Sequence, residues 1–436
     1  MAVNAASIAA ALVRHGMDAS ELVARQSLYT GVIERHAMMR GRPPEHVFWV
    51  PGRLEVFGKH TDYAGGRTLV CPVPRGFGVA VSARGDSVVR VADAWRGEEV
   101  SIPFTAGPTA HTGWRHYVDV TVRRLARNFP GAALGADIAI ASDLPRASGM
   151  SSSSALVIAI AAALGRVAML PKHPAWKLNV HNNLDAAAYY ACIENGRNFA
   201  GLAGDAGVGT YGGSEDHAAI VEGRPRQVSA FAFVPPRALG AAVVPDRWRF
   251  VIAPSGVAAR KTGEAREPYN RLAAGIALLL DAWNRQGSKA VSLAAALKSD
   301  PAAADRLREL ADLAATDEFN AGWLRSRLEH FICEDARVPA ALAAFESVDS
   351  ARLTTLSDES QSDADTLLGN QVHATRTLVA SARKQGAFAA CSFGAGFGGA
   401  VWALVDHRDA EAFAKFWHNG AFVMRPGLPL TEVSSL

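Results

Sequence analysis

Apolar residues first recur along the chain at helical intervals and then in short strand-like segments. Residues 5–40 predict two helices, because apolar side chains recur three to five positions apart and Asp18 or Ser20 can cap the second one. β-branched segments punctuated by Gly and Pro follow and predict strands at 46–50, 68–73, 78–83 and 88–92. The same patterns predict helices over 114–128, 151–167 and 174–195, and a strand over 136–141.

The second half of the chain is mainly helical. After a strand at 249–253, helices are predicted at 264–285, 303–315, 318–332 and 363–384, and the tail returns to strands near 387–392 and 400–406. Strands that come first and helices that come later, without regular βαβ alternation, indicate an α+β fold. The Pro235-Pro236 pair and the segment up to Asp246 are the best candidate for a boundary between two domains.

Composition excludes several classes of protein. The 436 residues include 45 Lys+Arg and 42 Asp+Glu, a net charge of +3 without a basic block, so we expect neither a nucleic-acid partner nor a membrane surface. The longest apolar run, 155–164, is too short to span a bilayer, and residues 1–16 lack the features of a signal peptide. Four isolated cysteines are typical of reduced thiols. We therefore expect a cytoplasmic protein.

Two glycine-containing loops resemble nucleotide-binding motifs only superficially. Five residues separate Gly52 from Gly58, and His60 follows Lys59, so this segment is not a P-loop. Residues 394–399 match the letters of the dinucleotide-binding motif, but a strand follows them where that fold requires a helix.

A serine-rich loop gives the strongest chemical signal. Residues 145–155 lie between a predicted strand and a predicted apolar helix, and four serines stand at the start of that helix. Hydroxyls and unpaired backbone N–H groups at a helix start favour an anion. We expect a phosphate or a nucleotide polyphosphate here; a serine-rich helix cap without a ligand is the alternative.

The order and spacing of the three loops resemble those of the GHMP kinases, and of the galactokinase branch most closely. The segment 51–63 resembles the galactokinase signature Pro-Gly-Arg-Val-Asn-Leu-Ile-Gly-Glu-His-Thr-Asp-Tyr. Residues 149–155 resemble the ATP loop of the family, and 394–399 its C-terminal glycine loop. The stretch 212–217 is similar to the Cys-Gly-Ile-Met-Asp-Gln segment that carries the catalytic Asp of galactokinases.

This resemblance implies a two-domain GHMP kinase fold, with an N-terminal ribosomal-protein-S5-like domain and a C-terminal ferredoxin-like domain. We expect a helical extension over 1–40 and domains over 41–245 and 246–436. The implied reaction is ATP- and Mg²⁺-dependent phosphorylation of the 1-hydroxyl of a sugar, galactose above all. The expected partner is this small sugar substrate, and we expect a monomer or a weak homodimer.

The resemblance also assigns residues to roles. Asp216 is the expected base, with Glu215 as its nearest rival, and Arg53 is expected to stabilise the transferring phosphoryl. Ser153 and Glu194 match the magnesium ligands, although Glu194 lies 22 residues before Asp216 and could be an ordinary surface Glu. The other matches are as follows: Gly149, Ser151, Ser152, Ser153 and Ser154 for ATP, and Lys59, His60, Asp62, Gly213 and Tyr269 for the sugar.

Two residues depart from the signature. Lys59 replaces its Glu, and Glu55 replaces its Asn. A lysine near the C6 end of the sugar would pair better with a carboxylate than with a hydroxyl, which keeps galacturonate open as a substrate, and arabinose too. Alternatively, Lys59 and Glu55 pair with each other. A non-catalytic sugar sensor and a kinase for homoserine or mevalonate also stay open, although the sugar-type segment 60–63 argues against the latter.

Overall fold

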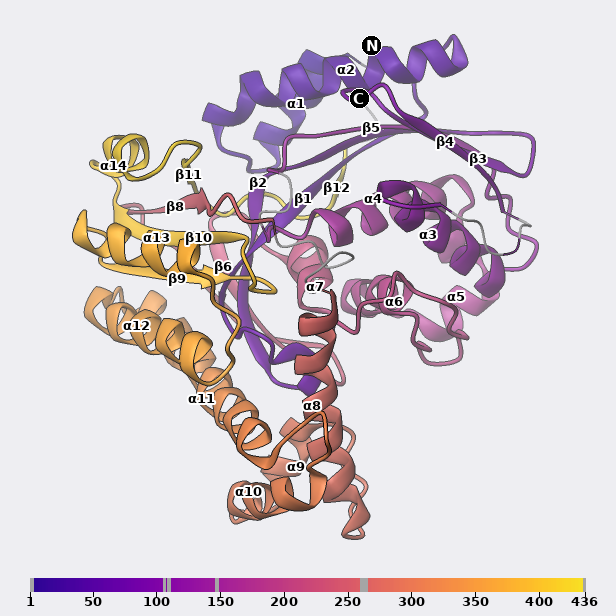
Figure 1. Cartoon of the computed structure of the whole chain (residues 1–436). Helices are drawn as coiled ribbons and strands as arrows, with labels where there is room; N and C mark the ends of the chain where they lie inside the picture. The colour runs from indigo at the N-terminus through magenta and orange to yellow at the C-terminus, as the bar shows by residue number, and fades with distance from the viewer. Residues whose placement is uncertain (1–3, 105–106, 108–110, 146–148, 259–265, 434–436) are drawn as a thin grey trace.

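Two β-sheets carry the fold, and helices cover both of them (Figure 1). The computed structural model describes residues 4–433 except 105–106, 108–110, 146–148 and 259–265. Both sheets combine with helices in the way expected of an α+β protein, so the predicted fold class is confirmed.

The first sheet is built on two long antiparallel strands, β1 and β2. Its strands run in the order β12-β1-β2-β5-β3-β4, and β6 and β7 continue the sheet from one end of β2. All neighbours are antiparallel except β3 and β5. The bounds are β1 His46–Phe57, β2 Arg67–Ala83, β3 Val88–Asp93, β4 Glu99–Pro103, β5 Ala136–Ser142, β6 Gln227–Ala232, β7 Arg237–Val243 and β12 Thr431–Glu432.

The predicted strands 68–73 and 78–83 are one continuous strand, β2. The pairing of β1 with β2 shifts register between Pro51 and Arg53, opposite the proline- and glycine-containing part of β2. A bulge of this kind tolerates residues that cannot join the hydrogen-bond ladder. The sequence signals for a turn therefore mark a bulge instead, and this bulge lies immediately before Arg53.

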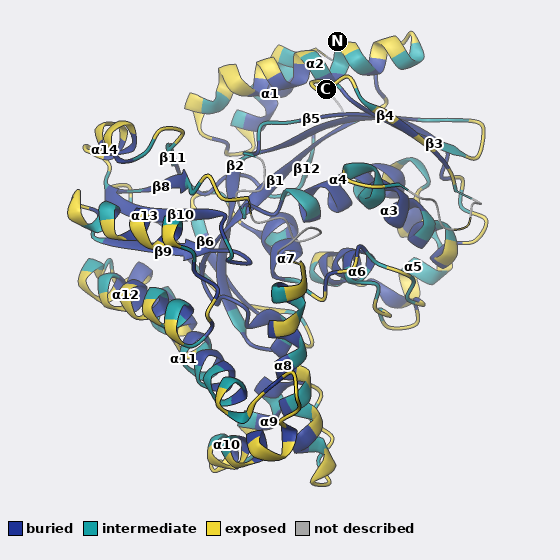
Figure 2. Cartoon of the chain, in the orientation of Figure 1, coloured by how far each residue is buried: buried dark blue, intermediate teal, exposed yellow. Residues whose placement is uncertain are grey.

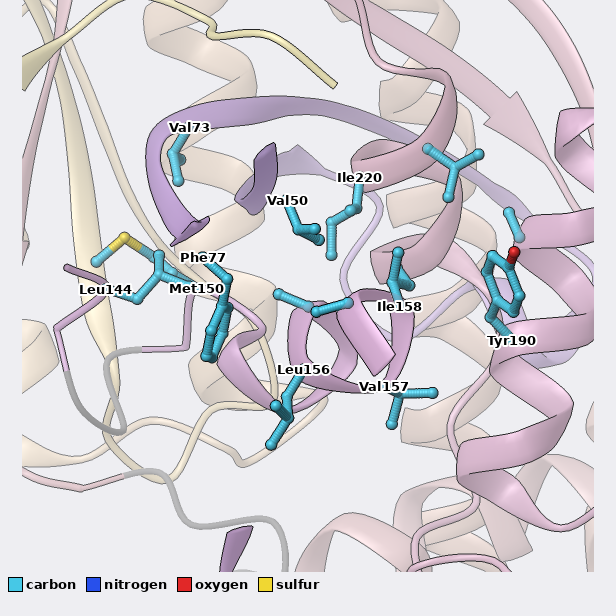
Figure 3. Packing of buried hydrophobic residues seen from close by; sticks show 14 of the residues in the cluster. Val50, Val73, Phe77, Leu144, Met150, Leu156, Val157, Ile158, Tyr190 and Ile220 are labelled. Atoms are coloured by element: carbon cyan, nitrogen blue, oxygen red, sulfur yellow. The ribbon is translucent and has the colours of Figure 1, made fainter. Parts of the chain in front are cut away.

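Helices bury both faces of the first sheet. Trp49 packs under the N-terminal layer of α1 and α2, whereas its neighbours Phe48 and Val50 belong to the main core on the other face, as alternation along a strand requires. The most apolar helix, α4, packs in that main core against β1 and β2 (Figure 3). The bounds are α1 Ala5–Arg14, α2 Leu22–Arg40, α3 Trp114–Asn128, α4 Ser152–Val167, α5 Pro174–Asn179, α6 Asn183–Asn195 and α7 Glu215–Glu222, with single 3₁₀ turns at Ala19–Glu21, Asp62–Ala64 and Leu170–Lys172.

The second sheet is smaller and wholly antiparallel, in the order β11-β8-β10-β9. Its bounds are β8 Trp248–Pro254, β9 Ala389–Phe393, β10 Ala400–Asp406 and β11 Phe422–Met424, and the helices α12 Ser350–Thr366, α13 His373–Lys384 and α14 Ala410–Trp417 accompany it. The helices α8 Arg266–Arg285, α9 Leu293–Ser299, α10 Ala303–Ala314 and α11 Ala321–Glu346 form an arm with its own apolar core. The outer side of this arm is exposed (Figure 2).

Several predicted elements have different limits in the structure. The predicted helix 363–384 is wrong, because α12 ends at Thr366 and Gly369 adopts a left-handed φ of +69° before α13 begins. The predicted helix 174–195 divides into α5 and α6, and that at 318–332 continues to Glu346. Residues 264–265 of the predicted helix 264–285 lie outside the described residues. The sequence interpretation missed β4, β6, β7, β11, β12, α7, α9, α12 and α14.

The change from the first sheet to the second falls after β7. Pro235 and Pro236 lie inside the β6–β7 hairpin, so this pair does not mark the change of sheet. Strand β12 returns from the end of the described chain to pair with β1 in the first sheet. The predicted range 246–436 therefore contributes one strand to the other sheet. Among the described residues, no helix is long and apolar enough to cross a membrane.

Candidate active site

Segments far apart in the sequence converge on one pocket. The serine loop at the start of α4 meets the glycine loop between β9 and β10: the carbonyl oxygen of Gly149 lies close to Gly394, whose φ of +80° favours glycine. The pocket beside them is lined by Arg53, Glu55, His60, Asp62, Tyr63, Ser154, Ala191, Glu194, Asn195, Thr210, Gly212, Gly213, Glu215, Asp216, His217, Tyr269, Gly394 and Ala395.

A buried ion pair between Arg53 and Asp216 lies at the centre of the pocket. Arg53 on β1 donates from Nε to Asp216 Oδ1 at 2.7 Å, and its Nη1 donates to the carbonyl oxygen of Gly149 at 2.5 Å. Burial opposes the Arg53 charge, but Asp216, Glu215 and Glu55 together raise its pKa. Asp216 lies in the first turn of α7, where the helix dipole stabilises an ionised carboxylate. The structure thus brings together the two residues that were expected to be catalytic.

The hydroxyl of Ser154 lies between two carboxylates. Its Oγ is 2.7 Å from Glu194 Oε2 and 3.2 Å from Asp216 Oδ2, and His217 Nε2 is 3.2 Å from the same Glu194 oxygen. Glu194 is buried, so it is not an ordinary surface Glu. The hydroxyl that contacts Glu194 is that of Ser154, on α4, whereas Ser153 was matched to the magnesium ligand from the sequence; a role for Ser153 at the metal stays a prediction.

The serine loop has the features of an anion site. Ser151 caps α4 in a left-handed conformation, with φ 56°, and its buried hydroxyl has no hydrogen-bond partner among the described residues. Ser152 and Ser153 are half-buried at the start of the same helix. An unpaired buried hydroxyl beside a helix N-terminus fits the oxygen atoms of a phosphate. The neighbouring residues 146–148 lie outside the described residues.

The residues expected to hold the sugar form a second wall of the pocket. Asp62 accepts hydrogen bonds from the backbone N–H groups of Tyr63 (2.8 Å) and Glu215 (3.1 Å), so it joins the signature segment to the start of α7. A Cβ at Gly213 would lie 2.3 Å from Asp62 Oδ2, which explains the glycine there. The Tyr269 ring on α8 lies 5.4 Å from the His60 ring.

His60 is held by the protein at both ring nitrogens. Nδ1 lies 3.0 Å from the Tyr63 hydroxyl, and Nε2 lies 3.1 Å from the carbonyl oxygen of Ala395. Since a carbonyl oxygen only accepts, Nε2 carries a proton and donates it to Ala395. Tyr63 is in turn a hydrogen-bond acceptor for Arg327 Nη2, at 2.9 Å. The signature segment is thereby tied to the C-terminal glycine loop and to α11.

The prediction that Lys59 contacts the sugar is wrong. Its side chain is only 1% exposed, and its ammonium lies 2.6 Å from Ser360 Oγ, 3.1 Å from Cys391 Sγ and 3.8 Å from Glu334 Oε1. These partners come from α12, β9 and α11, and the lysine is absent from the residues that line the pocket. Its ion-pair partner is Glu334 rather than Glu55, so the predicted pairing with Glu55 is wrong as well.

Sequence reasoning overlooked part of the pocket. Glu55 was noted only as a departure from the signature, yet it lines the site within 3.9 Å of Arg53. His217, Asn195 and Thr210 also line it. Their nearness to Asp216 or to Glu194 in the sequence was the available signal for His217 and Asn195. Thr210 has no such signal, because only the fold brings residues 196–213 back to α6.

Three known sequence families match the chain, in the order in which the site's segments occur. Residues 34–83 match the galactokinase galactose-binding signature, residues 116–221 the N-terminal domain of GHMP kinases, and residues 341–422 their C-terminal domain. This chain belongs to the GHMP kinase family. The three matches contain Arg53, Asp216 and the glycine loop respectively, so the family assignment and the geometry of the pocket concern the same residues.

Individual relatives agree with this assignment. A galactokinase from Actinobacillus pleuropneumoniae is 36% identical over 31% of this chain and 35% of its own length, and one from Roseiflexus sp. (strain RS-1) is 26% identical over 87% of this chain and 88% of its own. The matches to the first curated relatives thus span only about a third of those proteins. Lactococcus lactis galactokinase, solved in complex with galactose, superposes on this GHMP kinase with a TM-score of 0.71 at 21% identity, over 92% of this chain and 99% of its own. Mevalonate kinase from Methanococcus jannaschii gives 0.54 at 12% identity, over 87% and 98%. These structural likenesses concern the fold.

Proposed function

We propose that this GHMP kinase transfers the γ-phosphoryl of ATP to the 1-hydroxyl of galactose. The observation that carries the proposal is the Arg53–Asp216 pair, which contacts the serine loop at Gly149 and lines the same pocket as His60 and Asp62 of the galactose-binding signature. A base and a cation must adjoin both substrates for phosphoryl transfer between them, and this pair adjoins both walls of the pocket.

Asp216 and Arg53 have different roles in the transfer of the phosphoryl group. An ionised Asp216 accepts the proton of the attacking sugar hydroxyl, which makes that oxygen a better nucleophile. Arg53 holds Asp216 ionised and lies 2.5 Å from the Gly149 carbonyl oxygen at the serine loop, where it can stabilise negative charge on the phosphoryl.

The nucleotide and its metal fit the serine loop. The unpaired Ser151 hydroxyl and the start of α4 suit phosphate oxygens, and Ser154 with Glu194 offers one hydroxyl and one carboxylate to Mg²⁺. Among the described residues no group of three or more His, Cys, Asp or Glu could hold a metal ion, which agrees with a site where phosphate and water complete the shell. When bound, Mg²⁺ neutralises charge on the phosphates.

Galactose is favoured over galacturonate because of the charges in the pocket. The argument for a uronate depended on a free Lys59 ammonium, and that ammonium is buried against Glu334. The pocket is instead lined by Glu55, Asp62, Glu194, Glu215 and Asp216, with Arg53 as its cation among the described lining residues. A carboxylate on the sugar would meet like charges there.

An ADP-release assay with a sugar panel tests the proposal. We expect turnover with galactose and Mg·ATP, and at least tenfold lower kcat/KM with galacturonate and arabinose, a difference of about 1.4 kcal/mol. Asp216→Asn should lower kcat by about 10²–10⁴-fold. The matched control is Asp281→Asn, an exposed Asp on α8 that pairs with Arg285 and should leave kcat unchanged. Full activity of Asp216→Asn would refute its role as base.

The cellular setting is part of the same proposal. The four cysteines form no disulfide, which supports a reducing compartment such as the cytoplasm. We infer a protein that acts as a monomer or a weak homodimer on a small sugar. Sedimentation at increasing protein concentration would check the oligomeric state.

A further inference from the structure

Three buried carboxyl groups surround the single guanidinium of Arg53. Besides Asp216, Glu215 Oε1 lies 3.2 Å from Arg53 Nε, and Glu55 Oε2 lies 3.9 Å from Nη2. All four residues are buried. If every carboxyl group were ionised, two negative charges would stay uncompensated in a buried space, and burial makes such charges costly.

The surrounding charges do not resolve this excess. Lys59 acts on Glu55 from the far side, but Glu334 compensates much of that positive charge, and Glu334 itself acts on Glu55. Asp62 adds a further negative charge next to Glu215, whose backbone N–H it accepts. The backbone N–H of Gly394 donates to Glu55 Oε1 at 3.4 Å. The charged groups named here that face the Glu55–Glu215 pair are thus either anions or cations that already pair with an anion.

We propose that Glu55 and Glu215 hold one proton between them and thereby keep Arg53 paired with an ionised Asp216. The pair would act as a positioning element. It does not take the substrate proton, but its protonation determines which carboxylate forms the ion pair with Arg53. Neither galactokinase motif to which these segments are similar has a carboxylate at either position, where Asn and Met stand instead. The pair therefore departs from both motifs.

The electrostatic balance agrees with this geometry. Burial raises the pKa of Glu55, although Arg53, Lys59 and a hydrogen bond with Glu215 counteract it. Burial raises the pKa of Glu215 well above its ordinary range, and the neighbouring Glu55 adds to that rise. Two carboxyl groups that interact with each other and with the same guanidinium lose their protons as a pair rather than separately.

The shared proton has a consequence for activity. A carboxyl group with a raised pKa keeps its proton below that pKa and loses it as the pH rises. Once both are ionised, Glu215 at 3.2 Å and Glu55 at 3.9 Å compete with Asp216 for the ion pair with Arg53. Activity should therefore fall on the alkaline side. This consequence rests on the proposed phosphoryl transfer, whereas the shared proton itself does not.

Infrared spectroscopy tests the proton without any substrate. With ¹³C-labelled glutamate, the wild-type protein at neutral pH should show an isotope-shifted C=O band of a protonated carboxyl group. The band should disappear in Glu215→Gln and in Glu55→Gln, and it should persist in Glu222→Gln, at the other end of α7. Identical spectra in all four proteins would overturn the proposal.

The pH profile of kcat tests the positioning role. We expect an alkaline fall in the wild type that is absent from Glu215→Gln, since glutamine cannot ionise, and that persists in Glu222→Gln. An alkaline fall that is the same in Glu215→Gln and in the wild type overturns the positioning role. Absence of sugar phosphorylation by the wild type would instead refute the proposed function, and the infrared band would still decide whether the proton is shared.

Discussion

Lys59 and Glu55 lie four residues apart on the same segment, yet their side chains have different partners. Glu55 faces the pocket and Arg53, whereas Lys59 is buried against Glu334. Burial disfavours the charged forms of Lys59 and Glu334. The opposite charge of the partner offsets this penalty, so the pKa of Lys59 is raised and the pKa of Glu334 is lowered. The residue types are visible in the sequence, but this choice of partners is not.

The Lys59–Glu334 pair leads to a stability prediction. Lys59→Met leaves the Glu334 carboxylate buried with less compensation, so it should lower the free energy of unfolding by about 3–5 kcal/mol. In Lys59→Met/Glu334→Gln the loss should be smaller than the sum of the two single losses, because glutamine carries no charge and still accepts from the Gly58 N–H. Urea unfolding measures both.

The control for Lys59→Met is Lys177→Met, at an exposed position on α5. This substitution should change the free energy of unfolding by no more than about 0.5 kcal/mol. The interpretation fails if Lys59→Met raises the sugar KM and leaves stability unchanged, because that pattern belongs to a sugar contact.

Helix α11 connects the helical arm to the pocket. It begins in the helical arm and reaches the signature segment of β1, where it supplies the cationic side chain of Arg327 and the carboxylate of Glu334. Arg327 Nη2 donates to the carbonyl oxygen of His60 at 2.6 Å and to the Tyr63 hydroxyl at 2.9 Å. The arm thus supports the loop that carries His60 and Tyr63 on the second wall of the pocket, although it contains none of the sequence motifs.

The support by α11 predicts a defect in sugar binding. Arg327→Met removes charged hydrogen bonds to His60 and Tyr63, each worth about 1.5–3 kcal/mol, and should raise the galactose KM at least tenfold with a smaller effect on the ATP KM. The matched control is Arg325→Met on the same helix, where the arginine is partly exposed and pairs with Asp312. Equal effects of the two substitutions would contradict this role of α11.

For the whole molecule, buried histidines link stability to pH. Burial lowers the pKa of His330 well below its ordinary value, and the Arg327 charge lowers it further; burial also lowers the pKa of His36. The folded protein therefore holds these residues neutral, while the unfolded chain binds protons below about pH 6.5. Their contribution to stability is complete above that pH and is lost as the pH falls.

His330→Gln isolates this contribution. Glutamine can still accept from Arg327 but binds no proton, so the stability of the wild type relative to the variant should decrease by up to about 1.4 kcal/mol per pH unit below about pH 6.5. Glu55 and Glu215 oppose this trend equally in both proteins, because their raised pKa values give stability that is lost as the pH rises. Urea unfolding at several pH values between 5.5 and 7.5 provides the measurement. A constant difference would show that His330 binds its proton equally well in the folded and the unfolded protein, and would contradict this prediction.

Local sequence patterns were sufficient to predict a helix or strand where the element is regular and buries one face. They predicted α3 and β10 closely, but they failed where distant segments decide the outcome. Prolines and glycine in β2 indicated a turn, and pairing with β1 made them part of a bulged strand. The eight residues of α7 carry too little periodicity for prediction, and its start is capped by the Asp62 carboxylate 153 residues away in the sequence.

By itself, the sequence determined the α+β class, the three loops and the presence of Arg53 and Asp216, because each depends on residue types and spacing within a short segment. The tertiary structure decided which charges meet. Ser154 rather than Ser153 faces Glu194, Lys59 pairs with Glu334, and Glu55 joins Glu215 at Arg53. Electrostatic partners are selected by distance and burial, and for side chains this far apart in the chain both arise only when the two sheets and the helical arm pack together.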